Sequence, residues 1–100
     1  MKQLPSQPKA VIIGGVVVGC STANHLTKFG WSDVVLLERK QLTSGTTRHA
    51  AGLIGRLRAT SNMTKLAKYS AELHTGLEAE TGLATGYRRT GSVALAPLPL

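Results

Sequence analysis

The chain has 100 residues, a formal net charge of +7 and a single cysteine. A chain of this length forms at most one small domain, and a hydrophobic content of 42% is typical of a globular protein rather than a disordered one. The single cysteine excludes a disulfide within the chain. The longest apolar run is too short to span a bilayer, so no membrane association is expected. No signal or transit peptide is evident, and we therefore expect a cytoplasmic protein.

The first half of the chain predicts a strand, a helix and a second strand. Residues 1–9, which include two prolines, are expected to form a loose leader. The aliphatic run 10–13 ends at two glycines, which is typical of a buried strand followed by a turn. Residues 17–29 carry apolar side chains at helical spacing, and the run 34–37 is a second aliphatic strand. Residues 10–38 therefore predict a right-handed strand–helix–strand unit.

The second half predicts a loop, a long helix and a further strand. Residues 39–61 are expected to be a loop with one short helical turn near Ala50. An amphipathic helix is expected over 64–81, and residues 91–96 predict a third strand before a tail at 97–100. The apolar stripe of the helix is expected to belong to the core and consists of Leu66, Tyr69, Leu73 and Leu77. The predicted fold class is α/β, a partial Rossmann-like unit that occupies residues 10–96 as the N-terminal portion of one domain.

The turn after the first predicted strand matches part of the dinucleotide-binding fingerprint GxGxxG. Gly14 and Gly19 occupy its first and third glycine positions. The helix that follows would direct its free amides and the positive end of its dipole at a pyrophosphate. Glu38 ends the second predicted strand, where its carboxylate can accept hydrogen bonds from both ribose hydroxyls. An acid at this position disfavours a 2′-phosphate, so FAD or NAD is expected rather than NADP.

The middle position of the fingerprint is occupied by Val16 instead of glycine. A side chain at this position stands between the backbone and the pyrophosphate. Gly15 is adjacent but one residue out of register. Two interpretations therefore stay open: a dinucleotide site, or an α/β unit that has kept the fold and lost the cofactor.

Seven basic residues and no acidic residue lie between Arg39 and Lys68. Such a stretch suits the phosphates of a nucleotide, a nucleic acid, anionic lipid or simply a solvated surface. The sequence has no nucleic-acid-binding motif and no aromatic residues interleaved with the basic ones, so we expect no nucleic-acid partner. We also expect no metal site. A nucleic-acid binder that uses this stretch would show a steep salt dependence.

Several segments resemble the N-terminus of the dimethylglycine/sarcosine dehydrogenase family, which are FAD-dependent enzymes of the D-amino-acid-oxidase-like superfamily. The most specific is Ser-Gly-Thr-Thr-Arg-His-Ala-Ala-Gly at 44–52. The resemblance covers residues 9–96, and the segments that carry it are 11–21, 34–39, 42–53, 66–70, 77–82 and 90–96. It implies the N-terminal part of an FAD-binding domain. The implied enzyme oxidises the N-methyl group of an amino acid such as sarcosine or dimethylglycine by hydride transfer to the flavin.

The resemblance also assigns site residues. Arg39, Ser44, Thr46 and Thr47 are expected to approach the ribose and phosphates. His49 falls where members of the family attach the flavin covalently through the imidazole; without the family segment it would be an ordinary loop histidine. The candidate cofactor-binding residues are Gly14, Gly15, Val16, Val18, Gly19, Glu38, Arg39, Ser44, Thr46, Thr47, His49 and Gly52.

Two further departures from the family pattern bear on activity. Arg48 occupies a position that is usually Trp in these dehydrogenases. A related non-catalytic branch, which resembles the pyruvate dehydrogenase phosphatase regulatory subunit, also carries Thr-Arg here but lacks the histidine, so His49 favours the catalytic branch.

Family members run to several hundred residues, so the substrate domain is expected to be absent and no catalytic residue can be assigned. We expect the chain to be inactive alone or to need a complementary chain; the alternative is a non-catalytic nucleotide-binding or interaction module that has lost the flavin.

Overall fold

The computed structural model describes residues 3–99. Residues 1–2 of the predicted leader and residue 100 of the predicted tail lie outside the described residues. The chain divides into two compact units, with the division between Ala51 and Gly52. No helix within the described range combines the length and the apolar character needed to cross a bilayer.

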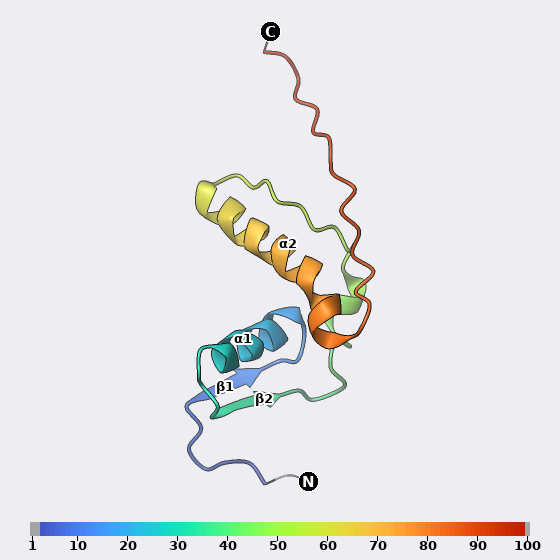
Figure 1. Ribbon diagram of the computed structural model, residues 1–100. Coiled ribbons are helices and arrows are strands. Elements are labelled where there is room, and N and C mark those ends of the chain that lie inside the picture. The colour runs from blue at the N-terminus through green and yellow to red at the C-terminus, as the bar shows by residue number, and fades with distance from the viewer. Residues whose placement is uncertain (1–2, 100) are drawn as a thin grey trace. The chain divides into compact units, whose positions relative to one another are not determined.

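The first unit is a strand–helix–strand. Strand β1 (Ala10–Ile13) pairs in parallel with β2 (Val34–Leu37), residue for residue along all four positions. Helix α1 (Val17–Lys28) connects the two strands and lies along one face of the pair, as Figure 1 shows. The predicted unit is confirmed, with the helix one residue shorter than expected at its C-terminal end.

Helix α1 packs closely on the start of the sheet because the residue at the contact has no side chain. Gly19 is buried, and a Cβ atom added to it would collide with the carbonyl oxygen of Gly14 and lie 3.3 Å from Cγ2 of Ile12. Ile12 therefore faces the helix. Side chains alternate along a strand, so Val11 and Ile13 point to the opposite face.

The sheet face opposite α1 is apolar and open. The exposed fraction is 51% for Val11, 86% for Ile13 and 39% for Leu37. The strand register places Val11 beside Val35 and Ile13 beside Leu37, so these side chains form one continuous surface. Parallel sheets are normally covered on both faces. This surface, which we call the open sheet face, is therefore the kind of surface that another layer of polypeptide covers.

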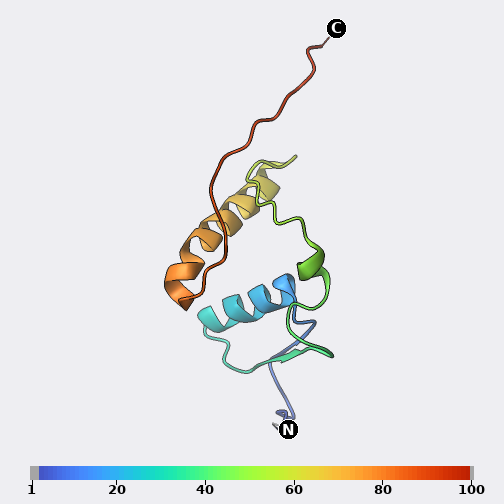
Figure 2. The same ribbon diagram turned by 90° about the vertical axis from the view of Figure 1, so that its right-hand side faces the viewer.

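The second unit is one long helix with an extended segment on each side. Helix α2 (Ser61–Thr81) begins after Thr60, whose Oγ1 accepts a hydrogen bond from the Met63 amide at 3.3 Å. It ends at Gly82, which has φ +72. The segments 52–60 and 83–99 both run in the opposite direction to α2 (Figure 2). The predicted helix is confirmed and starts three residues earlier than expected because the Thr60 cap sets its first turn.

The strand predicted over 91–96 does not form. These residues have no ladder partner, and Val93 and Leu95 are 90% and 94% exposed. Within the described residues, the sheet contains β1 and β2 alone. A strand needs a neighbouring strand for its backbone hydrogen bonds, so a suitable sequence is not sufficient.

The apolar stripe of α2 is also not the core that its spacing predicts. Leu66 is 59% exposed and Tyr69 is 49% exposed. Leu73 and Leu77 are half-buried, and the buried residue of the helix is Ala71. An amphipathic pattern identifies the face that prefers burial, but burial requires a second layer against that face.

Candidate functional site

The turn between β1 and α1 has a backbone suited to binding an anion. Gly14 has φ +110, a conformation that glycine adopts readily and other residues rarely do. Val16 is the N-cap of α1, with extended dihedrals and no side-chain cap. Among residues 3–99, no group accepts a hydrogen bond from the amides of Val18 and Gly19. Unpaired amides at the start of a helix, together with the helix dipole, favour a bound phosphate.

The carboxylate of Glu38 is fixed against this turn. The Gly15 amide donates to Oε2 at 2.8 Å, and the Lys40 amide donates to Oε1 at 2.9 Å. The hydrogen bond from Gly15, then that from Lys40, lowers the pKa of Glu38 below its ordinary value of 4.5, with a smaller contribution from Arg39. Each carboxylate oxygen has two acceptor positions, so each keeps one for a further donor such as a ribose hydroxyl.

We expect acid to destabilise the first unit through Glu38. Because the pKa is lower in the folded chain than in the unfolded chain, ionised Glu38 contributes its full stabilisation above about pH 4.5. That contribution is lost as the pH falls through the folded-state pKa. Urea unfolding of the wild type and Glu38→Gln between about pH 7 and pH 3 measures it. The stability difference between the two proteins should shrink as the pH falls; a difference that is independent of pH would contradict the expectation.

The segment after β2 folds back over the turn. The Thr43 amide donates to the Gly15 carbonyl at 2.9 Å, and the Val17 amide donates to Oγ1 of Thr47 at 3.2 Å. A Cβ atom placed on Gly45 would lie 3.2 Å from Cγ1 of Val16. The returning segment, residues 42–47, is therefore held against the turn and the first residue of α1 by two hydrogen bonds, with Gly45 facing Val16.

The structure brings most of the predicted site residues of the first unit to one place. Thr46, Thr47 and His49 lie in η1 (Thr46–His49), a short 3₁₀ helix at the position where a helical turn was predicted. The side chains of Arg39 and His49 are exposed. The residues that lie in the turn, at the start of α1, directly after β2 or in the returning segment are Gly14, Gly15, Val16, Val18, Gly19, Glu38, Ser44, Thr46 and Thr47.

One predicted site residue falls in the second unit, and two residues that contact or face the turn were not among the predicted ones. Gly52, with φ +75, is part of the second unit. The contacts of Thr43 and Gly45 with the turn were not predicted, because they join residues far apart in the sequence. The only signal for Gly45 was its place in the specific segment 44–52.

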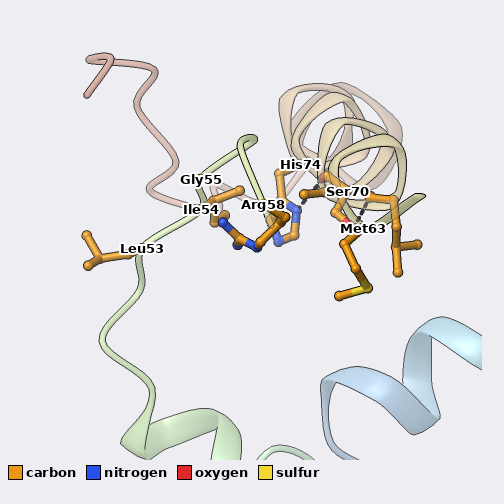
Figure 3. A pocket seen from close by; sticks show the side chains of 9 residues that line it. Leu53, Ile54, Gly55, Arg58, Met63, Ser70 and His74 are labelled. Atoms are coloured by element: carbon orange, nitrogen blue, oxygen red, sulfur yellow. Dashed lines mark hydrogen bonds between the residues drawn. The ribbon is translucent and has the colours of Figure 1, made fainter. Parts of the chain in front are cut away.

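A cavity in the second unit contains no predicted cofactor-binding residue. It has a volume of about 260 Å³ and lies between the segment 53–58 and α2 (Figure 3). Its lining is mainly apolar, with Arg58 and His74 as its titratable side chains, and Nδ1 of His74 is 2.7 Å from the Ser70 carbonyl oxygen. Within residues 3–99, no group of three or more His, Cys, Asp or Glu side chains is arranged to hold a metal ion.

Comparison with known proteins identifies the family. A family model described as "FAD dependent oxidoreductase" matches residues 9–99. The chain belongs to this family. It is 50% identical over 93 residues to the pyruvate dehydrogenase phosphatase regulatory subunit of Mus musculus. It is 45% identical over 98 residues to dimethylglycine dehydrogenase of Homo sapiens and 44% identical over 93 residues to 4-methylaminobutanoate oxidase (formaldehyde-forming) of Paenarthrobacter nicotinovorans.

These matches cover nearly all of this chain but a small part of each relative. They span 93%, 98% and 93% of the chain and 11% of each relative's length. The crystal structure of glycine oxidase from Bacillus cereus ATCC 14579 superposes with a TM-score of 0.66 and 32% identity, over 82% of this chain and 24% of that enzyme. The predicted family and the predicted α/β, Rossmann-like fold class are therefore confirmed.

The relatives include enzymes and a regulatory subunit. Identity to the regulatory subunit is 50%, somewhat higher than the 45% and 44% identity to the two enzymes. Similarity alone therefore does not separate a catalytic from a regulatory role.

Two of these relatives are named as mitochondrial, whereas the sequence led us to expect a cytoplasmic protein; the location stays a prediction.

Proposed function

We propose that the first unit binds the ADP half of FAD, and that the chain is the FAD-binding N-terminal part of an amine oxidoreductase. The observation that carries the proposal is the hydrogen bond from the Gly15 amide to Glu38, which fixes an ionised carboxylate against the turn that leads into the unpaired amides of Val18 and Gly19. An acid for the ribose and free amides for the phosphates fit one half of a dinucleotide. Family membership supports FAD as that dinucleotide. Calorimetric titration with ADP tests the assignment directly.

Each part of the site would have a separate task. Glu38 would accept hydrogen bonds from the ribose hydroxyls, and the amides of Val18 and Gly19 would donate to a phosphate. Thr47 would hold the returning segment over the start of α1. When FAD is bound, its flavin supplies the chemistry by accepting a hydride from the N-methyl carbon of an amino acid such as sarcosine or dimethylglycine.

We also propose that His49 attaches the flavin covalently. Its imidazole is exposed at the end of η1, in the first unit, two residues after Thr47, whose Oγ1 accepts a hydrogen bond from the Val17 amide. Protein reconstituted with FAD should keep its yellow colour after acid precipitation, and His49→Ala should lose it. His74→Ala, a change at a histidine of the second unit, serves as the control. Colour that is washed out of the wild type by acid would show that any bound flavin is held without a covalent bond.

A complementary polypeptide of the same family is the partner we propose for activity. The open sheet face and the small share of each relative that the chain spans both support it. The purified chain alone should not turn over sarcosine or dimethylglycine. Mixed with human dimethylglycine dehydrogenase from which the matched 98 residues have been deleted, it should co-elute, and Ile13→Asp should abolish this co-elution. Dye reduction by the isolated chain, or co-elution that survives Ile13→Asp, would contradict the proposal.

The second candidate function is a non-catalytic one. The 50% identity to a regulatory subunit favours it, and Arg48 is consistent with that branch. In this case the first unit keeps the fold as an interaction module and no longer holds a flavin. A folded chain that binds neither FAD nor ADP would support this candidate.

A further inference from the structure

Val16 and Gly45 face each other between the turn and the returning segment. Val16 is half-buried at the N-cap of α1, and Gly45 immediately precedes η1. A Cβ atom on Gly45 would approach Cγ1 of Val16 to 3.2 Å. This is a few tenths of an ångström closer than the 3.5–4.0 Å that is optimal between carbon atoms. With the Val16 side chain in place, a Cβ atom at position 45 fits only if one of the two segments shifts by a few tenths of an ångström.

Thr47 lies in the same returning segment as Gly45. Thr47 is two residues beyond Gly45, and its Oγ1 accepts the hydrogen bond from the Val17 amide at 3.2 Å. That distance is at the long end of the range for an N–H···O hydrogen bond. A displacement of the segment by a few tenths of an ångström would therefore weaken or break the hydrogen bond.

We infer that Gly45 is a positioning residue whose importance depends on Val16. In the fingerprint, the glycine at the middle position leaves the turn without a side chain. Here Val16 fills that position, and the space for it comes from the facing segment through the missing side chain of Gly45. This pairing lets the returning segment pack against the turn. It thereby maintains the hydrogen bond that the Val17 amide donates to Oγ1 of Thr47. Its consequence for nucleotide binding rests on the proposed function, whereas the pairing itself does not.

A double-mutant cycle tests the pairing in the full chain. The wild type, Val16→Gly, Gly45→Ala and the double variant are unfolded in urea, and exchange of the Val17 amide is followed by NMR. Gly45→Ala should raise the unfolding equilibrium constant at least about tenfold when Val16 is present, which corresponds to about 1.4 kcal/mol. It should also remove protection of the Val17 amide. In the Val16→Gly background both effects should largely disappear.

The cycle separates the contact from the backbone preference of Gly45. Any cost of replacing glycine at this backbone position is common to both backgrounds and cancels in the difference. If Gly45→Ala does not fold but the double variant does, the rescue supports the pairing. Equal effects of Gly45→Ala in the two backgrounds, whether measured by unfolding or by failure of both variants to fold, would overturn it.

ADP affinity then distinguishes a positioning role from a purely structural one. Gly45→Ala should weaken ADP binding at least about tenfold when Val16 is present, and leave it nearly unchanged when residue 16 is glycine. An equal loss in both backgrounds would overturn the positioning role. If the wild type itself binds no ADP, the proposed function fails, and the unfolding and exchange data still decide the pairing.

Discussion

Replacing Gly19 by alanine is expected to lower the stability of the first unit by about 3 kcal/mol or more, or to unfold it. The added methyl group would collide with the carbonyl oxygen of Gly14, which is backbone and cannot rotate away. The only relief is a shift of α1 away from β1, and that shift would open the turn that holds Glu38 through Gly15. Hydrogen exchange of the amides in β1 and β2 measures the loss for the first unit alone.

Gly76→Ala is the matched control for this prediction. Gly76 also lies inside a helix, but a Cβ atom there would meet no atom within 4 Å. Alanine is a better helix former than glycine, so this variant should stabilise α2 by about 0.5–1 kcal/mol. The same chemical change is therefore expected to act in opposite directions at the two positions. Unchanged exchange of the strand amides in Gly19→Ala would show that the helix does not pack on the turn as closely as described.

Replacing Val16 by glycine is expected to strengthen the binding of ADP and FAD at least about tenfold. The side chain stands at the position where a dinucleotide's phosphates approach the backbone most closely, and it fills the gap toward Gly45. Removing it opens that gap. Glycine is also a better N-cap residue than valine, so the substitution should not destabilise the start of α1.

Val16→Ala supplies the intermediate size in this experiment. A steric effect predicts that affinity rises from valine through alanine to glycine, as measured by calorimetry at constant salt. Constant salt matters because the basic residues near the site also attract phosphate. If affinity does not rise in Val16→Gly, the valine side chain does not limit the approach of the phosphates.

The strand–helix–strand and the place of Glu38 could be predicted because their signals are local. β1 and β2 are short aliphatic runs, and α1 begins at a glycine-rich turn and ends just before Gly30. Each of these signals lies within the element that it predicts. Glu38 follows from the end of β2, although its hydrogen bond to the Gly15 amide was not foreseen.

What could not be predicted depends on partners distant in the sequence. The contact of Gly45 with Val16 joins two segments that only the fold brings together. The residues 91–96 have the composition of a strand, and Leu66 has the spacing of a core residue, but both are exposed. Composition and periodicity indicate which side chains prefer burial. The segment's own sequence does not indicate whether another strand or helix packs against it and buries them.

Titration of the folded chain with ADP and FAD tests the central claim most directly. We predict saturable binding of both ligands at one site, at least about tenfold weaker in Glu38→Ala and unchanged in Glu72→Ala, which removes an acid from α2. Amide shifts on binding should map to Gly14, Gly15, Val18 and Gly19. A folded chain that binds neither ligand, or binding that is insensitive to Glu38, would contradict the assignment of the first unit as a dinucleotide site.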